Sequence, residues 1–241
     1  MNLVHQTREF FDRQPCGSLH PDPTTQRYFV QPHIPGFAQF ERWNGKRVLE
    51  IGCGIGTDTL EFARAGADID AVEFSVKSRA LAMKKLEGER FFSPIIWQTD
   101  AENFLPFGRF DLVYSFGVLH HTPHPVLVLA GTHNILKNDG ELRIMLYAKW
   151  SIKHLFRIQP EAQAGCPLVK WYSEREARKL LESCGFRVTS IEKTHIFPWR
   201  IKDYIEHRCV KAWPWRWMSD SLFHWLEHRL GHHLLIVAVK G

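Results

Sequence analysis

The chain has 241 residues, of which 44% are hydrophobic and 24% charged, a composition typical of a soluble globular protein with a substantial core. No apolar run reaches the ~18–20 residues that a membrane-spanning helix needs, and the first residues lack the pattern of a signal peptide. The net charge of +5 and the pI near 9.0 agree with an anionic substrate, RNA or a lipid surface without selecting one of them. Five scattered cysteines without a C-x-x-C pair indicate reduced thiols in a cytoplasmic protein.

Residues 1–46 precede the first strong strand signal and are expected to form an N-terminal helical cap. An amphipathic helix is predicted over residues 4–13, with Phe10 and Phe11 on its buried side. Prolines interrupt the pattern that follows, and a second short helix is predicted over residues 35–43.

The segment 47–58, Arg-Val-Leu-Glu-Ile-Gly-Cys-Gly-Ile-Gly-Thr-Asp, is the most informative part of the sequence. A buried strand is predicted first, then glycines at alternate positions (Gly52, Gly54 and Gly56), then a helix from Thr57. Glycines in a strand–turn–helix allow positive φ and let a ligand approach the main chain, while the helix start favours anionic groups. The pattern therefore predicts a ligand-binding turn.

Two details argue against a dinucleotide site. The dinucleotide fingerprint requires a third glycine where this chain has Thr57, and Glu50 places a carboxylate in the strand, where it would repel a pyrophosphate. Glu-x-Gly-x-Gly-x-Gly instead resembles motif I of the class I S-adenosylmethionine (SAM) methyltransferases. The resemblance implies that Glu50 faces the ammonium end of the cofactor, that the three glycines admit it, and that Thr57 or Asp58 bonds its amino-acid end.

The next two strands end in acids. A second strand is predicted over residues 67–74, and Glu73 follows Gly52 by the ~20 residues expected of a ribose-binding carboxylate. Phe74 adjoins it on the cofactor side. A third strand is predicted over residues 91–99, followed by Asp100 and Ala101, which the resemblance assigns to the adenine.

The segment 108–123 is the second most informative one. A fourth strand is predicted over residues 110–115, and ligands gather at the carboxyl ends of strands in open α/β sheets. Phe-Asp-Leu-Val followed by Val-Leu-His-His resembles the small-molecule branch, including the ubiquinone and menaquinone methyltransferases. Main chain from Ser115 and Phe116 is then expected to face the methionine half of the cofactor.

His120 and His121 are candidate catalytic residues, since imidazole titrates near neutral pH. The alternative is that they only position the loop and the cofactor. His124 lies close by, but no carboxylate or thiolate completes a metal site there, so none is predicted.

The remaining elements complete an α/β fold. Helices are predicted over residues 125–136 and after a capping box, Ser173 to Glu176, and strands over residues 141–147, 186–194 and 233–239. Together with the resemblance, they predict a doubly wound, seven-stranded, Rossmann-like sheet whose last strand is antiparallel, in a methyltransferase domain spanning residues 47–241.

Two stretches depart from the family pattern, residues 148–170 and 195–232. Both are expected to cover the acceptor, with Tyr28 of the cap, Trp150 and Trp199 as candidate substrate-binding residues. The second stretch, here called the link, interleaves tryptophans with basic residues, which suits a peripheral membrane contact, RNA stacking or an aromatic anionic substrate. Alternatively, its residues 201–210 and 219–230 form two helices that fold back as a lid, with their tryptophans in the core. His224, His228 and His232 recur at every fourth position and are interpreted as one helix face rather than a metal site.

These observations predict an enzyme that transfers a methyl group from SAM to a small molecule by in-line displacement, releasing S-adenosylhomocysteine. The methylated atom (O, N or C) and the oligomeric state stay open. An RNA methyltransferase is the alternative, although neither an Asn-Pro-Pro-Tyr motif nor an appended RNA-binding module supports a nucleic-acid partner. A non-catalytic methyltransferase-like scaffold is the alternative from another class.

Overall fold

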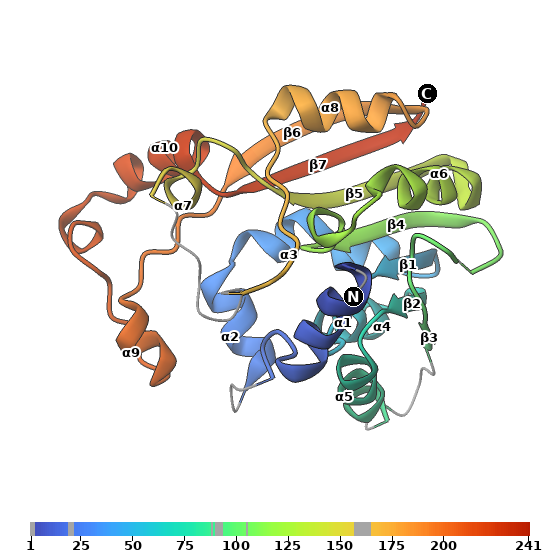
Figure 1. The fold of residues 1–241 in the computed structure, drawn as a ribbon, viewed down its shortest axis with the longest axis horizontal. Helices are drawn as coiled ribbons and strands as arrows, with labels where there is room; N and C mark the ends of the chain where they lie inside the picture. Colours follow the sequence, from blue (N-terminus) through green and yellow to red (C-terminus); the bar gives the residue numbers. More distant parts are fainter. Residues whose placement is uncertain (1–2, 19–21, 88, 90–93, 105, 157–164) are drawn as a thin grey trace.

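The computed structural model describes residues 3–18, 22–87, 89, 94–104, 106–156 and 165–241. Its centre is a seven-stranded sheet with the order β3-β2-β1-β4-β5-β7-β6 (Figure 1). Strands β1 to β5 pair in parallel with one another, whereas β7 is antiparallel to both β5 and β6. This confirms the predicted fold. The strands are β1 Arg47–Ile51, β2 Asp68–Glu73, β3 Ile95–Gln98, β4 Phe110–Phe116, β5 Leu136–Tyr147, β6 Phe186–Thr194 and β7 His233–Lys240.

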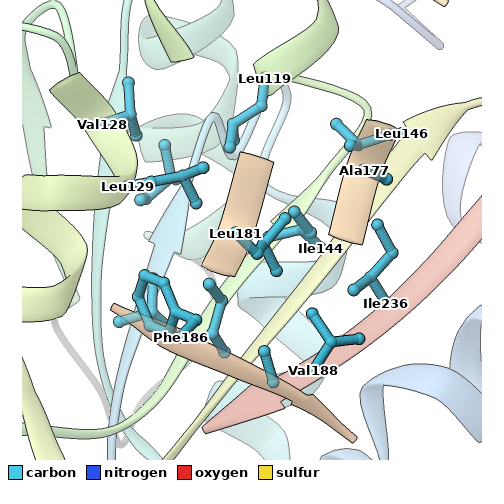
Figure 2. Close-up of a cluster of buried hydrophobic side chains, with 14 of the residues drawn as sticks. Leu119, Val128, Leu129, Ile144, Leu146, Ala177, Leu181, Phe186, Val188 and Ile236 are labelled. Carbon is cyan, nitrogen blue, oxygen red and sulfur yellow. The ribbon is translucent and has the colours of Figure 1, made fainter. Parts of the chain in front are cut away.

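Helices cover both faces of this sheet. Alternate strand residues point to opposite faces: Leu49 and Val113 join one buried cluster, and Val48 and Leu112 join another. Figure 2 shows part of the first cluster, where helices α6 and α8 contribute Leu129 and other apolar residues against the sheet. The helices are α1 Leu3–Arg13, α2 Pro23–Val30, α3 His33–Ala38, η1 Phe40–Trp43, α4 Thr57–Arg64, α5 Val76–Leu86, η2 Leu119–His121, α6 Pro125–Ile135, α7 Ile152–Leu155, α8 Glu174–Glu182, α9 Ile201–Ile205, η4 Trp215–Trp217 and α10 Asp220–Leu230.

Most predicted boundaries hold within one or two residues, and the capping box of Ser173 and Glu176 is present. The predicted helix over 35–43 is wrong as a single element, because Gln39 adopts a left-handed conformation (φ 55°) that ends α3 and starts η1. Strand β5 begins at Leu136, earlier than predicted, because Leu136 already pairs with Phe110 before a register shift. Of the predicted third strand, residues 91–93 lie outside the described residues.

The link between β6 and β7 departs most from expectation. Helix α9 ends at Ile205 and is shorter than the predicted 201–210, whereas α10 lies where a helix was expected and packs on β6. The interpretation of the link tryptophans as core is wrong for Trp213, Trp217 and Trp225, which are 80%, 76% and 55% exposed. His232 follows the end of α10 and therefore does not share a helix face with the histidines of that helix. Among the described helices, none is both long and apolar enough to cross a membrane.

Candidate functional site

The three glycines of the β1–α4 turn have positive φ values of 77°, 57° and 75° for Gly52, Gly54 and Gly56. They differ in their surroundings. A Cβ atom on Gly52 would lie 2.3 Å from Val118, and one on Gly56 would lie 2.9 Å from Ala82. The lack of a side chain at these two glycines therefore lets Val118 and Ala82 pack closely against the turn. A Cβ atom on Gly54 would meet no atom within 4 Å. The open space at Gly54 is the place where a ligand can approach the main chain.

Glu73 lies at the end of β2, beside this turn. Its carboxylate is 7% exposed and accepts hydrogen bonds from the backbone N–H groups of Gly54 (2.7 Å) and Ser75 (2.8 Å). Burial raises the pKa of Glu73, while the backbone donors act in the opposite direction. Two fixed donors orient the carboxylate and leave acceptor capacity for hydroxyl groups, as ribose binding requires.

Glu50 is buried in β1 and accepts a hydrogen bond from the hydroxyl of Thr59 on α4. Burial, with a further contribution from the nearby Asp58, raises the pKa of Glu50 to about 8. A cationic group bound beside Glu50 would stabilise its carboxylate form, because opposite charges favour ionisation. The residue therefore fits the ammonium end of an amino-acid ligand.

Asp58, on the first turn of α4, is 1% exposed. Its oxygens accept hydrogen bonds from Arg27 Nε (2.8 Å) and Nη2 (2.6 Å) and from the hydroxyls of Tyr28 (2.9 Å) and Tyr114 (3.0 Å). Helix α2 of the N-terminal cap is thus bonded to the start of α4, next to the glycine-rich turn. Tyr28, one of the predicted substrate-binding residues, is held in place by its bond to Asp58. Thr57, the other residue predicted for the amino-acid end, accepts a hydrogen bond from Lys85 Nζ (2.8 Å).

Arg27 was missed by sequence reasoning, because nothing in the sequence pairs it with an acid 31 positions later. Two of its guanidinium nitrogens bond Asp58, and its guanidinium lies 5.3 Å from the ring centre of Phe116. The third nitrogen, Nη1, forms no hydrogen bond within the part of the chain that the structure describes. Arg27 is therefore placed to bind a carboxylate at this end of the site.

Asp100 and Ala101 follow the end of β3. Asp100 accepts a hydrogen bond from the backbone of Glu102 (2.9 Å), and burial raises its pKa. Ala101 packs against the core cluster of Figure 2. Ser115 donates its hydroxyl to the carbonyl of Ile51 (3.0 Å), so its side chain ties β4 to β1.

The two candidate catalytic histidines lie in different environments. His120 is fully buried and stacks on Tyr147 with ring centres 3.7 Å apart. Neither of its ring nitrogens forms a hydrogen bond of normal geometry among the described residues, and burial followed by the neighbouring His121 lowers its pKa. His121 Nδ1 lies 2.7 Å from the carbonyl oxygen of Leu168. Because a carbonyl only accepts, Nδ1 carries the proton and Nε2 keeps its lone pair.

A second polar group, here called the histidine cluster, lies at the other half of the carboxyl edge. It comprises His33 of α3, His195 after β6, and His232 and His233 at the start of β7. Burial lowers the pKa of His195, His232 and His233 well below the ordinary value and that of His33 to about 4. Lys153 of α7 adjoins the cluster, and burial lowers its pKa to about 7.

The other two predicted substrate-binding residues, Trp199 and Trp150, differ in how exposed they are and in what they contact. Trp199 is half-buried and stacks on Phe29 of α2, with ring centres 5.4 Å apart. Trp150 is 62% exposed and contacts His154 edge-on. Phe74, predicted on the cofactor side, is half-buried with the guanidinium of Arg8 over its ring.

Comparison with known proteins decides the family. The sequence profile described as "Methyltransferase domain" matches residues 26–191. The chain belongs to this methyltransferase family. The match confirms the resemblance read from the motifs, and SAM is the cofactor. The buried carboxylates and the open turn fit that assignment.

The relatives differ in what they act on. The ubiquinone biosynthesis O-methyltransferase of Actinobacillus pleuropneumoniae serotype 5b is 32% identical over 104 residues, which are 41% of this chain and 44% of that relative. The tRNA U34 carboxymethyltransferase of Hydrogenovibrio crunogenus is 27% identical over 204 residues, which are 80% of this chain and 57% of that one. The chain therefore spans about half the length of such relatives.

Among solved structures, the magnesium protoporphyrin IX methyltransferase of Synechocystis PCC 6803, determined with bound SAM, superposes with a TM-score of 0.63 at 16% identity. The match covers 100% of this chain and 98% of that one. At this identity the similarity establishes the shared fold.

Proposed function

We propose that this protein transfers a methyl group from SAM to a small-molecule acceptor. The observation that carries the proposal is the placement of three acids, Glu50, Glu73 and Asp100, at or near the carboxyl ends of adjacent strands β1, β2 and β3. Glu73 accepts a hydrogen bond from the main chain of the turn at its middle glycine, Gly54, which borders open space.

Each acid suits one part of the cofactor. Glu50 stabilises the ammonium group, Glu73 accepts hydrogen bonds from the ribose hydroxyls, and Asp100 with Ala101 contacts the adenine. Arg27, fixed by Asp58, binds the carboxylate of the methionine portion. Bound SAM supplies an activated methyl group, so the protein's contribution is alignment and exclusion of water, which is worth up to about 7–11 kcal/mol of the barrier.

An acceptor with an O–H or N–H group also needs a base. His121 suits this role better than His120, because the bond from Nδ1 to Leu168 leaves Nε2 free to accept a proton. The acceptor is proposed to lie beneath the cap, residues 148–170 and the link. Residues 157–164 of this cover lie outside the described residues.

Two features bear on the acceptor class. The Val-Leu-His-His loop and the O-methyltransferase relative favour a small molecule, whereas the tRNA-modifying relative and the pI near 9.0 keep RNA as the second candidate. The five free cysteines support a cytoplasmic location.

The test uses SAM labelled in its methyl group, incubated with purified protein and an extract of the source cells. Label in the aqueous or organic small-molecule fraction supports the proposal, and label in the nucleic-acid fraction supports the RNA alternative. The Glu73→Ala variant serves as the matched control that lacks the ribose-binding acid. Retained S-adenosylhomocysteine binding with no label in any fraction would contradict methyl transfer and favour the scaffold alternative.

A further inference from the structure

The histidine cluster is assembled by topology. His233 pairs with Tyr147, the last residue of β5, because β7 runs antiparallel to β5. His195 directly follows the end of β6, and Thr194 also pairs with His233. The histidines therefore meet at the same sheet edge as the cofactor site, on its β5-β7-β6 half. His195, His232 and His233 are each at most 3% exposed.

The distances suit a metal ion. One ring nitrogen from each of His195, His232 and His233 lies within 4.8 Å of the corresponding nitrogens of the other two. Ligand nitrogens at about 2.0–2.1 Å from a tetrahedral zinc ion are roughly 3.4 Å apart. Closing the site around such an ion therefore brings these nitrogens closer together by up to about 1.4 Å, from at most 4.8 Å to roughly 3.4 Å.

Hydrogen bonds orient one of the three imidazoles, that of His232. His232 Nδ1 lies 2.9 Å from the carbonyl oxygen of His195, so Nδ1 carries the proton and Nε2 presents its lone pair. A carbonyl acceptor behind the ligating imidazole is the usual arrangement in metal sites. In this structure the lone pair of Nε2 faces the amine of Lys153 at 2.8 Å, so this amine competes with a metal ion for that nitrogen.

A fourth imidazole, that of His33, contacts one of the three central histidines, His233. His33 Nε2 lies 3.0 Å from His233 Nδ1, and His33 comes from the cap rather than from the sheet edge. Within the described residues, no carboxylate or thiolate joins the three central histidines. Imidazole-only sites select borderline ions such as zinc, copper, nickel and iron over magnesium and calcium.

We propose that His195, His232 and His233 bind one divalent transition-metal ion of the zinc class, with His33 as the hydrogen-bond partner of His233. Nothing in this proposal depends on methyl transfer or on the identity of the acceptor. The site lies next to Phe116, whose ring centre is 5.4 Å from that of His233. A bound ion would thus stand between the cofactor loop and the link.

The test is a metal titration of the full chain after removal of metals with a chelator. Co²⁺ is added while the visible absorption of tetrahedral cobalt is followed, and Zn²⁺ then competes. One equivalent is expected to bind, and His195→Gln and His233→Gln are each expected to weaken binding at least tenfold. The matched control is His224→Gln with His228→Gln, which removes two exposed histidines of α10 and leaves the cluster intact.

Lys153→Met keeps all the ligands and removes the amine that faces His232. This variant is expected to bind Zn²⁺ more tightly than the original chain. S-adenosylhomocysteine binding, measured on every variant, reports folding separately from the metal site. Absence of binding by the original chain, equal binding by the ligand variants, or unchanged or weaker binding by Lys153→Met would overturn the proposal.

Discussion

The two halves of the sheet's carboxyl edge are built from opposite chemistry. On the β3-β2-β1 half, buried carboxylates from Glu50, Glu73 and Asp58 surround a glycine-rich turn. On the β5-β7-β6 half, buried imidazoles and the amine of Lys153 gather around Tyr147. One half matches a ligand with an ammonium and several hydroxyls, and the other offers neutral nitrogen donors.

The halves also differ in how the chain makes them. Most of the acidic half comes from short segments that each follow a strand, whereas the imidazole half joins residues from the cap, α7 and both ends of the link. Arg27 and His33 connect the cap to both halves. This division predicts that substitutions in one half leave ligand binding in the other half unchanged.

The largest expected effect comes from Arg27→Met, which removes the cationic partner of the buried Asp58. Breaking such a pair from one side leaves an uncompensated charge, so the free energy of unfolding should fall by about 3 kcal/mol, measured by urea denaturation. Arg42→Met is the control, because Arg42 is half-exposed where it pairs with Glu141 and should cost no more than about 1 kcal/mol. Equal losses for the two variants would contradict the role given to Arg27.

Glu73→Ala should weaken S-adenosylhomocysteine binding by about 10–100-fold in calorimetry, since hydrogen bonds to a charged acceptor contribute about 1.5–3 kcal/mol. Zn²⁺ binding should not change in this variant. The matched control is Glu192→Ala, because Glu192 is an exposed acid on β6. A change in cofactor affinity below twofold would remove Glu73 from the ribose site.

The pKa of Glu50 gives a pH-dependent test. Because the folded-state pKa is raised from 4.5 to about 8, the carboxyl holds its proton near neutral pH and loses it when an ammonium binds beside it. S-adenosylhomocysteine affinity should therefore rise between pH 6 and pH 8, by at most about tenfold per unit. The contribution of Glu50 to folding has the opposite sign: it is present below pH 4.5 and is lost as the pH rises to about 8.

Glu50→Gln keeps an oxygen that accepts the Thr59 hydroxyl and cannot ionise. Both pH dependences should flatten in this variant. If the affinity of the original chain does not change between pH 6 and pH 8, the ammonium lies elsewhere.

The fold could be predicted from local patterns together with the family resemblance, and the same patterns place Glu50, Gly54 and Glu73 at one edge of the sheet; that these residues bind the cofactor stays a prediction. Strand, glycine turn and acid follow one another along the chain, so Glu50, Gly54 and Glu73 are recognisable by spacing. Arg27 and the histidine cluster could not be predicted in the same way, since their partners are 31 to 200 positions away. The adjacent pair His232–His233 before the last strand was the one local signal for the cluster, and assigning His232 to a helix face concealed it.

The smallest expected effect concerns the surface of the imidazole half. Trp213 and Trp217, 80% and 76% exposed, flank Arg216, whose guanidinium lies 5.5 Å from the ring centre of Trp217. Exposed indoles interleaved with cations suit the interface of an anionic membrane. The original chain should therefore pellet with anionic liposomes, and Trp213→Ser with Trp217→Ser should reduce the bound fraction about threefold to tenfold, as expected when ~1 kcal/mol or slightly more of interfacial binding is lost.

Trp150→Ser is the matched control, because Trp150 is 62% exposed but lies outside the link. Salt separates the electrostatic from the apolar contribution to liposome binding. In 1 M NaCl the screening length is about 3 Å, so the contribution of Arg216 should weaken while that of the indole rings remains. If the original chain stays in the supernatant at low salt, the membrane contact is excluded and the tryptophans must face another partner. If it pellets but the link variant pellets equally well, the contact lies on another surface, and the link then covers the acceptor without reaching the membrane.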